Sequence, residues 1–277
     1  MLRKVRVALR DYRRARRARA RATLVRAKTP VFVHTHGKVG SSTVTATIHD
    51  TFGDAFPVYH THLFDAANRD RARRKYAEGA RGGSEAHLIL SDAIAPYLEG
   101  LPFACYVITL TRNPIGRAIS HAMQTLRHWV PEDFDALPFD EQVERSNAHI
   151  DRLLSPERSV SDPSDWFDDE VKGVFGVDVF AEPYDFERGY TILTNGPVRV
   201  LVMRMEDLDR ALLPALSDLF ERPVETPMRK ANVGQRKPYA DLLGEIKRTY
   251  RPGPAIAERV LSGRYYQHFY ADAPERA

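Results

Sequence analysis

The chain has one cysteine in 277 residues, Cys105, so it cannot form an internal disulfide. It has no run of eighteen apolar residues, which argues against a transmembrane helix. The N-terminus also lacks the apolar core of a cleaved secretion signal. These absences are typical of a protein from a reducing compartment, and we expect a cytoplasmic location.

Acidic residues are scarce at the start of the chain. Residues 1–28 contain twelve Lys or Arg and one acid, Asp11, whereas the remainder contains 29 bases and 36 acids. We therefore predict a basic helical arm over 1–28, rich in the helix formers Arg and Ala, and an α/β domain over 29–277. The arm could lie on an anionic membrane surface at the inner face, touch nucleic acid, or remain solvated. The body has no basic patch interleaved with aromatics, so no specific nucleic acid is expected as a partner.

The stretch Thr35-His36-Gly37-Lys38-Val39-Gly40-Ser41-Ser42-Thr43 follows the apolar run Val31-Phe32-Val33. A strand, a glycine turn and a helix beginning near Ser42 form a cradle for an oxyanion, because the helix start presents N–H groups and positive charge. A nucleotide-triphosphate loop would carry a hydroxyl residue directly after Lys38 to hold magnesium, but Val39 stands there. This predicts a phosphate or sulfate site that works without a metal.

A second segment of the same kind follows the predicted strand of residues 104–110. Arg112 stands at the end of that strand, Asn113 and Pro114 suit the cap and first position of a helix, and Ser120 lies about two turns into it. An arginine fork and a hydroxyl on adjoining elements can hold a phosphate from two directions.

Together the two segments resemble the sulfotransferases that use 3′-phosphoadenosine-5′-phosphosulfate (PAPS). Residues 38–43 match that family's 5′-phosphosulfate loop, and Arg112 with Ser120 matches its 3′-phosphate signature. The closest resemblance is to the bacterial group named putative capsular polysaccharide synthesis proteins, whose members begin with a similar Gly-Lys-Val-Gly-Ser-Ser box. Residues 175–180, 186–190 and 202–208 are similar to that group too, so the resemblance spans about 30–271.

The resemblance implies transfer of a sulfuryl group from PAPS to a hydroxyl of a glycan, small molecule or lipid. Lys38 would stabilise the departing phosphate oxygen, and the peptide groups of the loop would fix the phosphosulfate. The cofactor-binding residues it implies are Lys38, Val39, Gly40, Ser41, Ser42, Thr43, Arg112, Ser120 and, in a late loop, Lys230, Asn232 and Lys237.

The group that takes the acceptor proton is open between two histidines. His60 and His62 follow a predicted strand, and its alternation puts both on one side. A neutral imidazole is a suitable base, and we expect His62 to act, with His60 as its substitute or orienting partner. An exposed or core role for either histidine remains an alternative.

Strand-like runs alternate with helical patterns along the body and end near Thr35, His60, Ser91, Leu110 and Met203. This alternation predicts a three-layer α/β fold in which helices flank a parallel sheet, and the resemblance implies the P-loop-like sulfotransferase version of it. Ligands of such sheets bind beyond the carboxyl ends of the strands. We expect a helical insertion over about 128–189, with a helix over 139–154, and a hairpin around Asn195-Gly196 that leads into the last strand.

Three other functions are compatible with parts of the sequence. A metal-dependent hydrolase could use the pairs His34/His36 and His60/His62, with Asp92 after a predicted strand at residues 88–90. A phosphotransferase could use Asp92 as its magnesium partner. A non-catalytic scaffold could be organised at a membrane by residues 1–28.

Overall fold

The computed structural model describes residues 13–77, 85–101, 103–156, 162–229 and 239–273. The described strands form one five-stranded sheet in the order β2-β1-β3-β5-β4. They are β1 (Val31–His34), β2 (Val58–Thr61), β3 (Cys105–Thr111), β4 (Tyr190–Asn195) and β5 (Val198–Arg204). All pairs are parallel except β4 with β5, which form the predicted hairpin. Gly196 turns that hairpin with a φ of 55°, a conformation that favours glycine.

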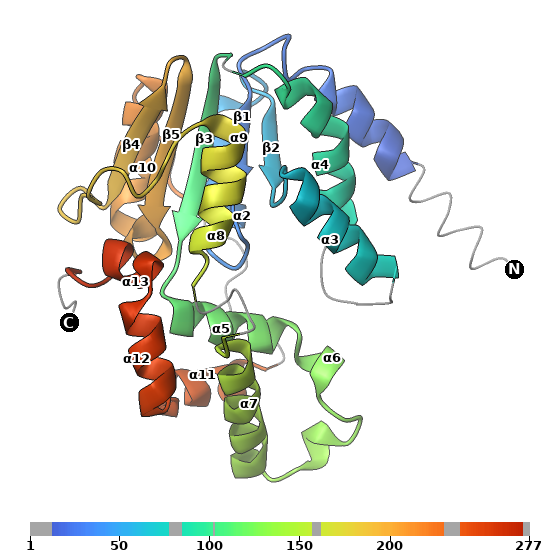
Figure 1. The fold of residues 1–277 in the computed structure, drawn as a ribbon, viewed down its shortest axis with the longest axis vertical. Coiled ribbons are helices and arrows are strands. Elements are labelled where there is room, and N and C mark those ends of the chain that lie inside the picture. The colour runs from blue at the N-terminus through green and yellow to red at the C-terminus, as the bar shows by residue number, and fades with distance from the viewer. Residues whose placement is uncertain (1–12, 78–84, 102, 157–161, 230–238, 274–277) are drawn as a thin grey trace, which may run out of the picture.

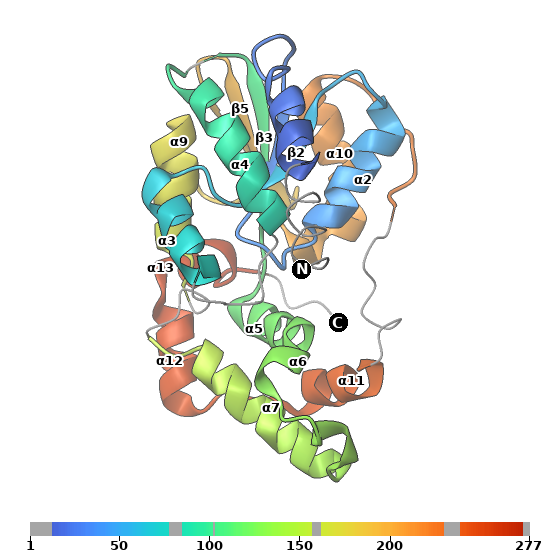
Figure 2. The same ribbon diagram turned by 90° about the vertical axis from the view of Figure 1, so that its right-hand side faces the viewer.

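Helices cover both faces of the sheet (Figures 1 and 2). Residues 13–22 are helical. The other helices are α2 (Ser41–Phe52), α3 (Ala66–Ala77), α4 (Glu85–Leu98), α5 (Pro114–Gln124), α6 (Leu126–Trp129), α7 (Phe139–Leu153), α8 (Ser164–Phe167), α9 (Gly173–Phe175), α10 (Leu208–Phe220), α11 (Ala240–Thr249), α12 (Pro254–Ser262) and α13 (Arg264–Phe269). Short 3-10 turns occur at Phe134–Ala136 and Met205–Asp207, and a π-helical turn at Asp168–Lys172 joins α8 to α9. Within the described residues, no helix is both long and apolar enough to cross a membrane.

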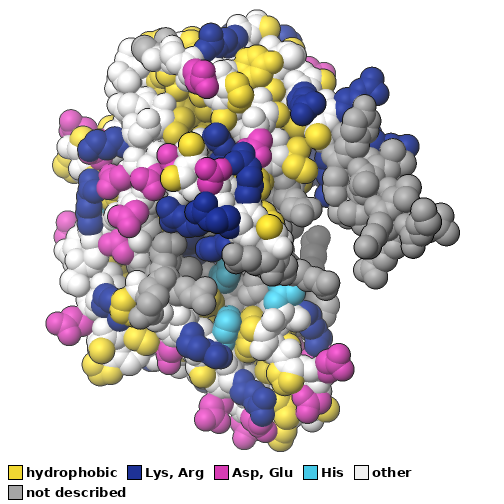
Figure 3. Space-filling view, turned by 45° about the vertical axis from the view of Figure 1, so that its right-hand side comes forward, with side chains coloured by type: hydrophobic (Ala, Val, Ile, Leu, Met, Phe, Trp, Pro, Cys, Tyr) yellow, Lys and Arg dark blue, Asp and Glu magenta, His cyan; other side chains and the backbone are white. Residues whose placement is uncertain are grey.

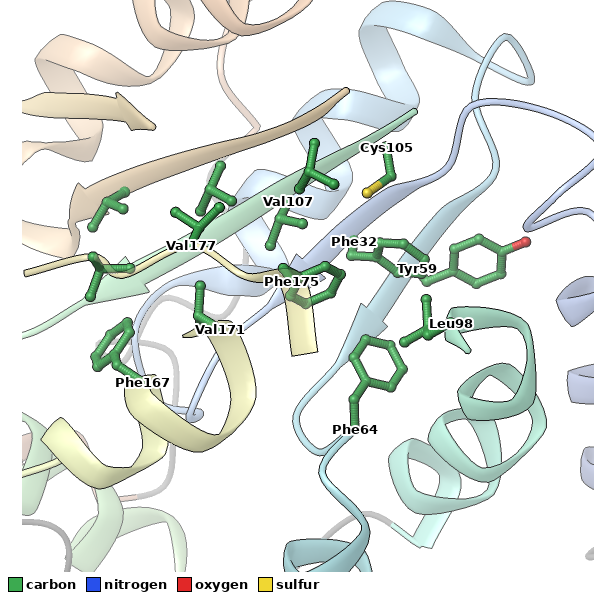
Figure 4. Packing of buried hydrophobic residues seen from close by; sticks show 14 of the residues in the cluster. Phe32, Tyr59, Phe64, Leu98, Cys105, Val107, Phe167, Val171, Phe175 and Val177 are labelled. Atoms are coloured by element: carbon green, nitrogen blue, oxygen red, sulfur yellow. The ribbon is translucent and has the colours of Figure 1, made fainter. Parts of the chain in front are cut away.

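The alternation of apolar residues along the strands divides the core between the two faces. Phe32, Val107 and Val200 point to one face, where they pack with α4, α8, α9 and α13 (Figure 4). Their chain neighbours Val31 and Ile108 point to the other face, where α2 and α10 cover them. Residues buried on both faces are expected for parallel strands, so the α/β class with a mostly parallel sheet is confirmed.

A third apolar cluster lies below the sheet in Figure 1 and joins α5, α7, α11 and α12. It contains Ala118, Met123, Ile150, Ile246 and Val260, all buried. Helix α5 therefore has two roles, because it starts directly after β3 and also forms part of this helical unit. The predicted insertion at 128–189 contributes α7 here, but its α8–α9 portion returns to the sheet.

One sequence prediction is wrong. Residues 88–90 are not a strand but part of α4. Ser91, Ile94 and Leu98 are the buried positions of α4, and their spacing of three and four residues is that of a helix face. Asp92 therefore does not follow a strand end, and its carboxylate pairs with Arg69 and Arg73 of α3.

Candidate functional site

The loop that carries Lys38 lies at the carboxyl end of β1 and leads into α2. Gly37, Lys38 and Gly40 all have left-handed backbones, with φ of 82°, 65° and 89°. A residue with positive φ beside one with ordinary φ can turn backbone N–H groups toward a common concavity that accepts anions, and Val39 stands between Lys38 and Gly40 in this way. The Val39 side chain is fully buried and anchors the loop. The predicted order of strand, turn and helix is confirmed, with α2 starting at Ser41.

The backbone donors at this loop are fewer than the sequence suggested. The N–H of Thr43 donates to the carbonyl of Gly40 at 3.0 Å, so it is already used to close the first turn of α2. The N–H groups of Ser41 and Ser42 lie at the start of the helix, where the α-helix itself provides no acceptor. These two groups, with the positive end of α2, are donors that an anion could use.

Two arginines from the next parallel strand and its helix hold the carbonyls of this loop. Arg112 donates from Nη1 to the Lys38 carbonyl at 2.9 Å. Arg117 donates from Nη2 to the His36 carbonyl at 3.3 Å and from Nε to the Gly37 carbonyl at 3.4 Å. The loop and the two arginines thus form one basic unit where the strand order reverses between β1 and β3, which is where open α/β sheets bind ligands.

Helix α5 runs along this unit and presents one face to it. Gly116, Ser120 and Gln124 are spaced by four residues and share that face. The Arg112 Nε lies 3.6 Å from where a Cβ of Gly116 would be, and the Lys38 ammonium donates to the Gln124 side-chain oxygen. One end of this face therefore lies beside the Arg112 guanidinium and the other beside the Lys38 ammonium, with Ser120 between them.

The position of Arg112 is fixed by its neighbours. Its backbone N–H donates to the Tyr265 hydroxyl at 2.8 Å, and that hydroxyl donates to the Arg112 carbonyl at 3.0 Å. Asn113 caps α5 as predicted, because its side chain accepts from the N–H groups of Ile115 and Gly116. Burial lowers the pKa of Arg112, and the nearby Glu206 carboxylate opposes this shift.

Arg117 and Glu206 are site residues that the sequence analysis missed. Arg117 is buried, and burial lowers its pKa to about 10, which still leaves it charged at neutral pH. Glu206 accepts the Asn113 N–H at 2.9 Å and faces Arg112. Neither residue is part of a sequence motif that we could recognise. The one available signal was a second arginine, Arg117, five residues after Arg112.

The two predicted histidines lie together at the end of β2, and a third joins them. The ring centroids of His60 and His62 are 5.0 Å apart, and His87 of α4 lies 4.6 Å from the first and 4.3 Å from the second. Burial lowers the pKa of His60 to about 4 and that of His62 well below its usual range, and the neighbouring His87 adds to both shifts. All three imidazoles are therefore neutral at physiological pH. On the face of the molecule that Figure 3 draws, histidine side chains of the lower part lie near Lys and Arg side chains.

The other histidine pair does not join this cluster. His34 is fully buried, with Nδ1 2.9 Å from the Thr61 hydroxyl and Nε2 3.3 Å from the Glu170 carboxylate. His36 points into an aromatic surrounding of Trp166, Phe167 and Tyr265. The pair expected for a hydrolase thus packs on Trp166 and stands outside the group formed by His60, His62 and His87.

A cavity of about 370 Å³ opens beside Gln124, the residue that binds the Lys38 ammonium. Its lining combines aromatic and polar side chains: Met123, Gln124, Leu126, Arg127, Phe134, Asp135, Phe139, Gln142, Tyr239, Asp241 and Leu242. Three other predicted site residues, Lys230, Asn232 and Lys237, lie outside the described residues. Ser120 is half-buried on α5.

The comparisons with known proteins give one family. The model described as "Putative capsular polysaccharide synthesis protein" matches residues 157–271. This segment is less than half of the chain. It contains α8 to α13 with β4 and β5. The Lys38 loop and Arg112 come earlier in the chain and lie outside the match. No curated protein and no solved structure matches the chain.

Proposed function

We propose that this protein transfers a sulfuryl group from PAPS to a hydroxyl of a carbohydrate acceptor in the synthesis of a capsular polysaccharide. The observation that carries the proposal is the face of α5, which has the Arg112 guanidinium at one end, the Lys38 ammonium at the other and Ser120 between them. A nucleotide with anionic groups at both ends suits this arrangement, whereas a lone phosphate would need only one of the two cations. The family match over 157–271 supports the polysaccharide theme.

The parallel sheet with its switch between β1 and β3 supports a P-loop-like sulfotransferase fold for this function. Arg112 and Ser120 would bind the 3′-phosphate, while Lys38 and the N–H groups of Ser41 and Ser42 would bind the phosphosulfate. Arg117 holds the carbonyls of His36 and Gly37, so it would position the loop without touching the ligand.

In the reaction, the acceptor oxygen forms a bond to sulfur as the bond from sulfur to the bridging phosphate oxygen breaks. The acceptor proton passes to a base, and the leaving nucleotide carries the negative charge, which the Lys38 ammonium stabilises. His62 is the proposed base. Its Nδ1 lies 2.6 Å from the Thr35 carbonyl, which can only accept, so Nδ1 carries the hydrogen and Nε2 keeps its lone pair.

The test is calorimetry of the full chain with 3′-phosphoadenosine 5′-phosphate in the presence of a chelator. Ser120→Ala removes one hydrogen bond to a charged phosphate and should weaken binding about ten- to a hundredfold. Arg112→Lys retains the charge but loses the fork, and a loss of tenfold or more is expected. Lys247→Ala, an exposed lysine on α11, is the matched control and should bind as the original chain does.

Turnover with labelled PAPS and a panel of glycan acceptors then tests Lys38→Ala, which should lower kcat at least a hundredfold while the fold is retained. Binding of magnesium-ATP without binding of 3′-phosphoadenosine 5′-phosphate would instead support a phosphotransferase and contradict the proposal.

A further inference from the structure

His60, His62 and His87 converge on one point although they come from two different elements. His60 belongs to β2, His62 follows it directly, and His87 lies in the first turn of α4. One ring nitrogen from each residue lies within 4.8 Å of the other two. Among the described residues, this is the one group of three or more histidine, cysteine or acidic side chains with such spacing.

Each of the three rings has a nitrogen that no protein hydrogen bond occupies. Nδ1 of His62 lies 2.6 Å from the Thr35 carbonyl, and Nδ1 of His87 lies 3.0 Å from the His60 carbonyl. A carbonyl can only accept, so in both rings Nδ1 carries the hydrogen and Nε2 is bare. Nε2 of His60 is buried and has no hydrogen-bond partner. Histidines that ligate metals are held in the same way, with the second ring nitrogen bonded to a carbonyl or carboxylate.

We propose that His60, His62 and His87 form a binding site for one divalent transition-metal ion of the zinc class. Neutral imidazoles suit Zn²⁺, Co²⁺, Ni²⁺ and Cu²⁺, whereas Mg²⁺ and Ca²⁺ require oxygen ligands, of which the cluster contains none. Three protein nitrogens leave a fourth tetrahedral position for an exogenous ligand.

The geometry requires only a small closure. Zinc–nitrogen distances of 2.0–2.1 Å in a tetrahedron place the ligand nitrogens about 3.4 Å from one another. Side-chain rotations that move each ring nitrogen by about 1 Å would therefore bring the cluster to a bound geometry. The rings are half-buried rather than locked in the core, which permits such rotations.

The surroundings indicate the kind of fourth ligand. His60 and His87 line a cavity of about 340 Å³ together with His49 and three arginines of the N-terminal helical segment, Arg14, Arg17 and Arg21. The positive charge of these arginines disfavours a bare cation and favours one that carries an anion. An oxyanion such as phosphate or sulfate is therefore the expected fourth ligand.

The metal site does not depend on the proposed sulfuryl transfer, but it shares His62 with it. A metal bound to His62 Nε2 would occupy the lone pair that takes the acceptor proton. Bound zinc would therefore inhibit transfer, and a chelator would restore it. Metal binding is measured without PAPS and transfer with a chelator, so one proposal can fail while the other stands.

The experiment uses the untagged full chain after treatment with a chelator and its removal. Titration with Co²⁺ is followed by visible absorption, which distinguishes four-coordinate from six-coordinate cobalt, and calorimetry measures Zn²⁺ with and without phosphate. The variants are His60→Gln and His87→Gln. His49→Gln is the matched control, because His49 lines the same cavity but stands outside the cluster. Circular dichroism checks that each variant is folded.

The expected result is one metal per chain, four-coordinate cobalt, tighter zinc binding with phosphate, and at least a tenfold loss of affinity in His60→Gln and His87→Gln but not in His49→Gln. Absence of stoichiometric binding in the original chain would overturn the site even if a variant failed to fold. Equal affinity in the folded His87→Gln variant, or six-coordinate cobalt, would overturn it too.

Discussion

At the scale of single residues, the Lys38 loop depends on backbone conformations that few side chains accept. Gly37 and Gly40 both have left-handed backbones, but their surroundings differ. A Cβ on Gly37 would meet nothing within 4 Å, whereas one on Gly40 would lie 2.7 Å from Leu208 Cδ1. Gly37 is thus required for its conformation alone, and Gly40 for its conformation and for the close approach of α10.

This difference gives a paired prediction. Gly37→Ala should cost about 1 kcal/mol of unfolding free energy, the usual penalty for a left-handed alanine. Gly40→Ala should cost about 2–4 kcal/mol, because Leu208 must also move within a packed core. Urea unfolding of both variants measures the two values. Equal losses of unfolding free energy in the two variants would show that the contact with Leu208 adds no cost to the Gly40 substitution.

His36 is a second residue whose burial has a measurable consequence. Burial lowers its pKa well below the usual value, and the Arg117 charge and then His62 add to the shift. The Tyr265 ring packs beside His36, and Nε2 of His36 is buried without a hydrogen-bond partner. Below about pH 6.5 the unfolded chain takes up a proton there that the folded chain does not.

The stability of the fold should therefore be insensitive to His36 above pH 6.5 and decrease as the pH falls below it. At pH 5.5 the loss from this residue is at most about 1.4 kcal/mol, the limit set by the unfolded pKa of 6.5. His36→Phe suits the aromatic surroundings and should remove that share of the loss between pH 7.5 and 5.5, as measured by urea unfolding with a chelator present. An unchanged pH dependence in the variant would contradict the assignment.

At the scale of elements, α5 connects the site to the helical unit, and its start is set by Asn113. The Asn113 side-chain oxygen accepts from the N–H groups of Ile115 and Gly116 at 3.0 and 3.4 Å. Asn113→Ala should cost about 1 kcal/mol of unfolding free energy, while Asn113→Ser, which retains an acceptor, should cost much less. Urea unfolding compares the two. If serine and alanine behave alike, the cap does not stabilise α5.

The same scale shows what the sequence could and could not predict. The strand, loop and helix around Lys38, the cap of α5, the helix at 139–153 and the hairpin at Gly196 were predicted from local signals, because turn residues and caps act within a few positions. Residues 88–90 were mistaken for a strand because a short apolar run has no clear period.

That error also concealed His87. Its place beside His60 depends on how α4 packs against β2, a contact between residues 27 positions apart. Arg117 and Glu206 were missed for a similar reason, since each acts through tertiary contacts. Local patterns thus predicted the conformation of the loop around Lys38, but the side chains that surround it come from packing between elements.

At the scale of the whole molecule, the N-terminal segment belongs partly to the core. Ala22 and Val25 are fully buried in the cluster that covers one face of the sheet. The Tyr59 hydroxyl donates to the Arg21 carbonyl at 2.7 Å. Deleting residues 1–28 to test a membrane role would therefore also remove part of the core, and a finer change is needed to separate the two effects.

Substitutions on the two faces of this segment make that separation. Val25→Ala removes two buried methyl groups and should cost about 2 kcal/mol of unfolding free energy without changing the charge. The double variant Arg16→Ala/Arg19→Ala changes two exposed side chains and should leave stability within about 0.5 kcal/mol.

If the segment touches an anionic membrane, that double variant should bind vesicles containing phosphatidylserine about 2 kcal/mol more weakly, since each basic residue near such a surface contributes about 1 kcal/mol. Vesicle sedimentation at low and high salt measures this. Equal vesicle binding by the original chain and the double variant would contradict a membrane role. Packing on the sheet would then be the role of this segment, because only Val25→Ala would change a measured quantity, the unfolding free energy.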